Sequence, residues 1–158
     1  MIEVKVSADI KEPVRLLTKL GVDMDAGVKA ILAAIATAGK TWVQRRMGAY
    51  IGTRSGWLKR HVYGRRRSDK HYVIAAPRHI AEPNERGATI KVKKAKILRF
   101  KGQDGKWKSK KMVQLPARRF FTQAYDGFEG SPEYEAAIDK GINRVLKRTF
   151  GAGWGISR

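Results

Sequence analysis

Hydrophobic residues recur at helical spacing in two long stretches, and the first begins at Asp23, a residue type that often caps a helix N-terminus. The apolar positions that follow are mostly three or four residues apart: Val28, Ile31, Leu32, Ile35, Ala38, Trp42 and Val43. This spacing predicts one long amphipathic helix that ends between Met47 and Gly52. Gly27 and Gly39 lie within it. Each glycine costs about 1 kcal/mol relative to alanine, and both would be tolerated if another backbone packs closely there.

The second stretch lies near the C-terminus and has a clear start signal. Ser131 suits the N-cap of a helix, and Pro132 suits its first position. The apolar stripe consists of Tyr134, Ile138, Ile142, Val145 and Leu146. Acidic residues near the start and basic residues near the end match the helix dipole. The pattern predicts a terminal helix over about 132–149.

Shorter apolar runs alternate with polar residues, as they do in strands that are buried on one face. Residues 2–6 and 71–76 predict strands, and 88–92 is a candidate strand among lysines. A short helix is predicted before Gly21, with Asp9 and Pro13 at its start. Residues 64–70 are basic and hydrophilic, and 77–87 contain two prolines, so both segments are predicted to be loops.

The sharpest local prediction is a hairpin centred on Asp104-Gly105, which is a strong signal for a two-residue turn. Such a turn puts Lys101 opposite Lys108, and cross-strand partners share a face of the sheet. One face is then predicted to carry Arg99, Lys101, Lys106, Lys108 and Lys110. The other face is predicted to carry Leu98, Phe100 and Trp107, which can pack on the body of the protein.

Together these elements predict an α+β fold. In it, a small antiparallel sheet with the basic hairpin packs on the long helix and the C-terminal helix. The length of 158 residues suits one domain, assigned to residues 1–150, followed by a glycine-rich tail at 151–158. The absence of cysteine excludes disulfides, thiolate zinc sites and cysteine nucleophiles. The longest weakly polar run, 28–39, is too short to cross a membrane, so no membrane is expected among the partners.

The net charge of +20 is carried by the middle of the chain. Residues 40–119 contain 24 basic and four acidic residues, whereas the two flanks together contain ten of each and are neutral. Such a field attracts polyanions and repels other copies of the chain. The charge therefore predicts neutralisation, at the place of work, by nucleic acid, by an acidic protein partner or by both.

Like charges placed opposite each other destabilise paired strands, so two such pairs in one hairpin favour the presence of an anionic partner. The five cations of the hairpin face are therefore the first candidates for contact with DNA or a partner. The alternative is a solvated face on which lysine also blocks unwanted edge pairing. The second candidate is the cluster of Arg65, Arg66 and Arg67, which suits phosphates or acidic side chains as well as plain solvent. Because no base-reading motif is present, any contact with nucleic acid is expected at its backbone.

The residues offer little for catalysis, and we predict a protein that is not an enzyme, with no cofactor and no metal site. The histidines, His61, His71 and His79, lack the spacing of metal ligands. His61 and His71 flank the basic segment and could act as acid and base in a small nuclease. Structural or surface roles are the commoner explanation for such residues.

Trp154 is isolated among the glycines of the C-terminal tail. A tryptophan at a chain end suits an anchor that docks on a neighbouring subunit. A disordered end is the alternative, because glycine-rich termini are often mobile when alone.

The order of these parts resembles the tail completion and neck proteins of long-tailed phages. A short strand and a long helix precede a Thr-x-Ser-Gly-x-Leu segment at 53–58, and strands and a Leu-Pro-Ala-Arg-x-Phe segment at 115–120 precede the terminal helix. Leu98-Arg99-Phe100 and the Asp104-Gly105 hairpin also look like the virion-morphogenesis pattern. Over about residues 2–148 the chain is similar to minor tail protein Z of lambda-like phages and to the virion-morphogenesis tail-component families. Arg119, however, stands where many relatives have a second proline.

The resemblance implies a structural virion protein that completes the tail and helps to join it to the head. It implies a homo-oligomeric ring around the DNA channel, a hexamer by analogy. Its neighbours would be tail tube, tail terminator and connector proteins, with non-specific contact to genomic DNA. The protein would be in the host cytoplasm during assembly and in the neck or tail of the virion afterwards. Pro116, Ala117 and Arg118 are expected to fix the turn into the last helix. The main alternative is a free, sequence-nonspecific nucleic-acid-binding protein.

Overall fold

The computed structural model describes residues 2–6, 10–50, 56–68, 71–93, 96–102 and 104–155. Its strands are β1 (Ile2–Val6), β2 (Tyr63–Ser68), β3 (His71–Ala76), β4 (Ala88–Lys91), β5 (Leu98–Lys101), β6 (Trp107–Lys110) and β7 (Met112–Leu115). Its helices are α1 (Lys11–Lys19), α2 (Met24–Arg46), the 3-10 turn η1 (Met47–Ala49), α3 (Trp57–Arg60), α4 (Arg78–Arg86), α5 (Phe120–Tyr125) and α6 (Pro132–Phe150). The strand pairs are antiparallel, and the predicted α+β class is confirmed.

The long predicted helix is α2, and it forms the spine of the fold. The side chain of Asp23 accepts a hydrogen bond from the amide of Asp25 at 3.0 Å, as expected of an N-cap residue. The predicted apolar stripe faces the core, since Ile31, Ile35 and Val43 have no exposed surface. None of the described helices is both long and apolar enough to cross a membrane.

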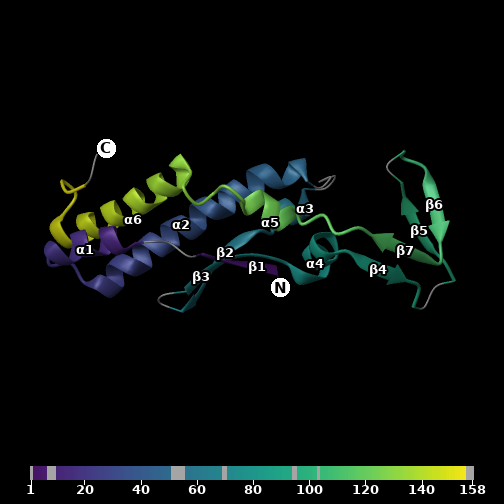
Figure 1. Ribbon diagram of the computed structural model, residues 1–158, viewed down its shortest axis with the longest axis horizontal. Coiled ribbons are helices and arrows are strands. Elements are labelled where there is room, and N and C mark those ends of the chain that lie inside the picture. The colour runs from purple at the N-terminus through teal and green to yellow at the C-terminus, as the bar shows by residue number, and fades with distance from the viewer. Residues whose placement is uncertain are drawn as a thin grey trace.

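The terminal helix α6 packs along α2, which is the closest association between any two helices of the fold (Figure 1). Its predicted start is confirmed: the hydroxyl of Ser131 accepts a hydrogen bond from the amide of Tyr134, and Pro132 is the first helical residue. A Cβ on Gly141 would lie 2.5 Å from the Cα of Ile31, so this glycine permits the close approach of the two helices.

The nearest neighbours of the two glycines of α2 are side chains rather than another backbone. A Cβ at Gly27 would lie 2.8 Å from the side chain of Leu17, and one at Gly39 would lie 2.4 Å from that of Ile74. Both glycines therefore make room for core side chains. The backbone contact occurs at the glycine of α6 instead.

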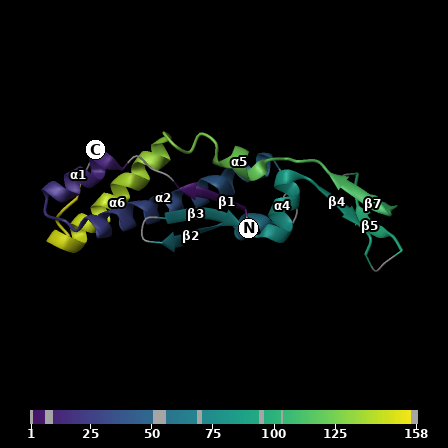
Figure 2. The same cartoon turned by 60° about the horizontal axis from the view of Figure 1, so that its bottom comes forward.

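One face of α2 is covered by a three-stranded sheet in which β3 lies between β1 and β2 (Figure 2). Gly64 approaches α2 so closely that a Cβ would lie 3.2 Å from the carbonyl oxygen of Ala36. The predicted strands 2–6 and 71–76 are confirmed, but the predicted loop at 64–70 is wrong for residues 64–68, which form most of β2. Backbone pairing with the buried strand β3 outweighs the hydrophilic composition of this edge strand.

Two short helices were not predicted. Residues 78–86 form α4, where two prolines indicated a loop. Buried Ala81 anchors this helix to the core, and Arg78 pairs with Glu82 one turn later, which compensates in part for the missing amide of Pro83. The hydrogen bond from Arg78 lowers the pKa of the half-buried Glu82 carboxyl. The second helix, α5, lies between the Pro-Ala-Arg segment and α6, so that segment does not lead directly into the last helix.

The molecule is elongated. Figures 1 and 2 show α1 and the C-terminal end of α6 at one end, the sheet with α4 and α5 in the middle, and strands β4 to β7 projecting at the other end. The largest fully buried side chains include Phe120, Phe121 and Phe128, all in or next to α5. Figure 1 also shows that the described part of the glycine-rich tail, 151–155, lies at the opposite end of the molecule from the projecting strands.

Candidate functional site

The projecting strands form a two-stranded arm, defined as residues 88–115. At its base, β4 pairs with β7, from Ala88 opposite Leu115 to Lys91 opposite Met112. At its tip, β5 pairs with β6 as a hairpin. The two pairs are joined on one side by residues 92–97 and on the other side by Lys111 alone, and Figure 1 shows the hairpin turned away from the direction of the base.

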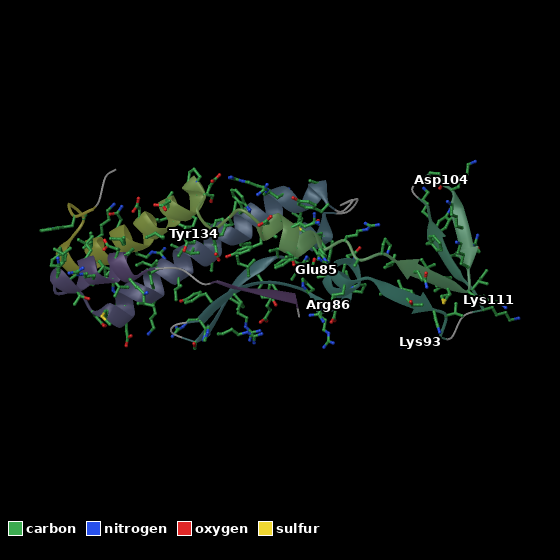
Figure 3. All side chains as sticks on the ribbon, in the orientation of Figure 1. Glu85, Arg86, Lys93, Asp104, Lys111 and Tyr134 are labelled. Atoms are coloured by element: carbon green, nitrogen blue, oxygen red, sulfur yellow. The ribbon has the colours of Figure 1, made fainter. Side chains whose placement is uncertain are left out.

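The arm leaves and rejoins the body at a junction held by Glu85 (Figure 3). This carboxylate is only 7% exposed. It accepts hydrogen bonds from the backbone amides of Phe121, at 2.7 Å, and Thr122, at 3.1 Å, and from the Thr122 hydroxyl. These amides lie in the first turn of α5 and have no partner within the helix, so Glu85 supplies what a capping residue would supply.

Backbone contacts close the same junction. The amides of Arg118 and Arg119 donate to the carbonyls of Asn84 and Glu85 at 2.9 and 3.1 Å. Gly87 has a φ of +78°, and a Cβ there would lie 2.9 Å from the amide nitrogen of Ala117. The residues before and after the arm are therefore fixed side by side, and the predicted turn residues 116–118 serve to join β7 to the junction.

The arm is the most strongly charged part of the chain. In 28 residues it has ten cations and a single acid, Asp104, a net charge of +9. The described cations are all exposed: Lys91, Lys93, Lys96, Arg99, Lys101, Lys106, Lys108, Lys110 and Lys111. Figure 3 marks Lys93 and Lys111 where the two strand pairs meet and Asp104 at the tip. All five cations that the hairpin prediction named thus lie in the arm.

The predicted register of the hairpin is wrong by one residue. Lys101 pairs with Trp107, and Phe100 pairs with Lys108. The amide of Gly102 donates to the carbonyl of Lys106, and that of Gly105 to the carbonyl of Gly102. Three residues rather than two therefore separate Gly102 from Lys106, the hydrogen-bonded positions that close the turn. Gly105, at a φ of +75°, takes the left-handed conformation that such a turn requires.

The shifted register divides the predicted basic face, because a one-residue slip moves each side chain to the other side of the sheet. Arg99 and Lys101 share one face with Trp107, and the guanidinium of Arg99 lies 5.9 Å from the centre of the Trp107 ring. Lys108 and Lys110 share the other face with Leu98 and Phe100. The hairpin thus presents cations on both faces.

The prediction that the apolar side of the hairpin packs on the body is also wrong. Trp107 is 67% exposed, and Figure 1 shows the hairpin at the far end of the molecule from α2 and α6. Ile90, Ile97 and Met112 of the arm are likewise more than 40% exposed. The arm combines a high charge with apolar side chains that the body does not cover.

The bend of the arm encloses an open hollow of about 590 Å³. Its apolar lining comes from Phe100, Met112 and Val113, and its cations are Lys108 and Lys110. The sequence pattern did not indicate this hollow, because it depends on the turn at Lys111 between β6 and β7. An exposed methionine next to a lysine pair was the only available signal.

The second predicted cluster lies on the body and is arranged differently. Arg65, Arg66 and Arg67 belong to the exposed edge strand β2 rather than to a loop. Arg67 forms an ion pair with Glu3 of β1, on the far side of β3. The structure therefore does not bring this cluster together with the arm.

The C-terminal tryptophan lies against its own helix. The ring of Trp154 is 5.0 Å from that of Phe150, and its amide donates to the carbonyl of Gly151. It is still 52% exposed. Trp154 therefore has surface left for a partner, although the C-terminal segment 151–155 that carries it is remote from the arm (Figure 1).

The histidines that a nuclease would need are not together. His71 begins β3, whereas His61 precedes β2 at the other end of the paired strands. His61 stacks on Trp57 at 3.9 Å, and His79 contacts the same ring edge-on at 5.7 Å. In the described part of the chain, no three His, Asp or Glu side chains are grouped as metal ligands.

Comparison of the chain with family models, with curated proteins and with solved structures gives no match in any of the three. Of the two segments that carry the resemblance to phage neck proteins, 115–120 forms part of the junction below the arm. Residues 53–55 of the other segment lie outside the described residues, as does Asp9 at the predicted start of α1.

Proposed function

We propose that the protein is a structural component of a phage virion. In this role it completes the tail and joins it to the head as a ring around the DNA channel. The observation that carries the proposal is the arm, a strongly cationic and partly apolar ribbon attached to a well-packed body. A surface of this kind serves attachment, and we expect no catalytic activity.

The physical properties of the arm support a role in assembly. A two-stranded ribbon is at best marginally stable in water, and exposed Trp107 and Met112 would be covered by a partner. The net charge of +20 favours solubility in the host cytoplasm, and long-range attraction speeds docking on acidic surfaces. Tail tube, tail terminator and connector proteins are the proposed neighbours, and genomic DNA would meet the basic surface through its phosphates.

Neutralising the arm tests this proposal. Replacement of Arg99, Lys101, Lys106, Lys108 and Lys110 by Gln should leave the body folded, because these side chains are exposed and project from it. Phage that carry this variant should accumulate separate heads and tails, counted by electron microscopy. A matched variant replaces five exposed cations of the body by Gln: Arg15, Lys19, Lys59, Arg60 and Lys147. It has the same net charge and should still join heads to tails.

Two outcomes would overturn the proposal. Normal joining and infectivity with the neutralised arm would remove the arm from the mechanism. Antibody labelling of purified particles that finds the protein absent from the neck and tail would remove the structural role altogether.

A second candidate function is free, sequence-nonspecific binding of nucleic acid. It is favoured by Trp107, whose exposed ring lies beside Arg99 and could stack on a base, and by cations on both faces of the hairpin. This function requires tight binding of DNA or RNA by the isolated monomer, with an affinity that falls steeply with salt. The neck role requires only weak binding before assembly, so a salt titration of the monomer separates the two.

A further inference from the structure

The protein has an acidic surface that complements the arm. Residues 126–135, here called the acidic segment, contain four acids and no lysine or arginine, a net charge of −4. The four are Asp126, Glu129, Glu133 and Glu135, and all are exposed. A chain with a net charge of +20 thus contains a continuous stretch with four negative charges.

The acidic segment is held firmly on the body. Phe128 in its middle is fully buried, and the hydroxyl of buried Ser131 caps α6. Arg46 donates to the backbone carbonyl of Asp126 at 2.9 Å. The backbone is therefore fixed while the four acidic residues are exposed, and the carboxylate of Glu129 is itself positioned by a hydrogen bond from the Tyr125 hydroxyl at 3.2 Å. Such an arrangement suits a preformed docking surface.

The arm does not reach the acidic segment of its own molecule. The segment includes the start of α6, where Figure 3 labels Tyr134, whereas the arm points away from this region at one end of the molecule (Figure 1). Any contact between the two surfaces therefore joins separate molecules. Two arms would not pair with each other, because each has a net charge of +9.

We propose that the arm of one copy docks on the acidic segment of a second copy. The inference rests on the proposed assembly of the protein as an oligomer and names the surfaces that would meet. Lys108 and Lys110 line the hollow at the bend of the arm and would face the carboxylates. Phe100 and Met112 supply the apolar part of the contact.

The attraction between facing charged side chains, rather than the repulsion between the net charges of two copies, determines whether this contact forms. At physiological ionic strength the Debye length is about 8 Å, so the overall +20 of each copy is screened while facing side chains still attract. Because the two surfaces differ, each copy offers one arm and one acceptor. Contacts of this type form a ring when the rotation between copies closes, or a reciprocal pair.

Two complementary variants of the full-length protein test the proposal. The arm variant is Lys108→Glu with Lys110→Glu, and the segment variant is Asp126→Lys with Glu129→Lys. Analytical ultracentrifugation of nuclease-treated protein should show assembly of the wild type and at least about tenfold weaker association of each variant alone. Mixing the two variants should restore association, because the native arm of one meets the native acidic segment of the other, and the charge-reversed arm meets the charge-reversed segment.

A control variant, Arg15→Glu with Lys59→Glu, changes the net charge as much as the arm variant but should assemble like the wild type. The proposal is overturned if wild-type protein stays monomeric after nuclease treatment, because the arm and the acidic segment then do not associate on their own. It is also overturned if the mixture stays monomeric while the wild type assembles. Circular dichroism confirms that each variant is folded. None of these results depends on where the protein lies in a virion, so this inference and the neck role can fail separately.

Discussion

The carboxylate of Glu85 accepts a hydrogen bond of 2.7 Å from the backbone amide of Phe121, 36 positions later in the sequence. Glu85 lies in the last turn of α4, which precedes the arm, and Phe121 lies in the first turn of α5, which follows it. One buried side chain therefore fixes both attachment points of the arm. The position of the whole cationic surface relative to the body depends on this contact.

Replacing Glu85 with Ala should destabilise the protein by about 2–3 kcal/mol, because buried amides of α5 lose their acceptor. Glu85→Gln should cost less, since one acceptor oxygen remains. Urea unfolding followed by circular dichroism measures both. Glu82→Ala, on the exposed side of the same helix, is the control and should have a small effect. Equal losses for Glu85→Ala and Glu82→Ala would contradict the assigned role.

Arg119 has a φ of +45° and precedes α5. Proline fixes φ near −65° and lacks the amide that Arg119 donates to the carbonyl of Glu85. Arg119→Pro should therefore lower stability by more than about 1 kcal/mol. Arg119→Gly should be neutral or stabilising, because glycine adopts a positive φ without strain. Thermal unfolding compares the two, and a stable proline variant would show that the junction has another conformation.

Gly141 sets the separation of α2 and α6. Gly141→Ala places a methyl group against the backbone of Ile31, and we expect a loss of about 1–3 kcal/mol from the displaced helices. Gly48→Ala is the matched control, because a Cβ there meets no atom within 4 Å. Chemical denaturation of both variants gives the comparison. A neutral Gly141→Ala variant would mean that the helices separate at little cost.

The arm should be removable without unfolding the body. Ala88 and Leu115 are paired, so a two-residue Asn-Gly turn can join them in place of residues 89–114. The shortened protein should keep a cooperative transition, with a melting temperature shifted by a few degrees at most, because a change of about 1 kcal/mol corresponds to about 2–4 °C at this size. Calorimetry measures the shift. Loss of cooperative unfolding would show that the arm is part of the core.

The helical parts of the fold could be predicted because their signals are local. Asp23 and Ser131 start α2 and α6, and the apolar period of each helix identifies the buried face. The prolines at 77 and 83 hid α4, since the helix is supported by the core around Ala81 and by side-chain pairs rather than by propensity.

The candidate site was predicted in composition but not in geometry. Asp104-Gly105 marks a turn, yet it suits both the two-residue turn and the three-residue turn that forms, and the difference reverses the faces of the hairpin. Glu85 could not be assigned at all, because its partners lie 36 and 37 positions later and meet it only in the folded protein. The acidic segment was visible in the sequence only as part of a neutral flank.

The side-by-side entry and exit of the arm at Gly87 and Ala117 has a mechanical consequence. When a docked arm is pulled along its length, both strands share the tension. That tension is transmitted to the body at the junction alone. There the backbone hydrogen bonds from Arg118 to Asn84 and from Arg119 to Glu85 are loaded together rather than one after the other. The resistance of an assembled particle to being pulled apart would then depend on this joint and not on the ribbon that extends from it.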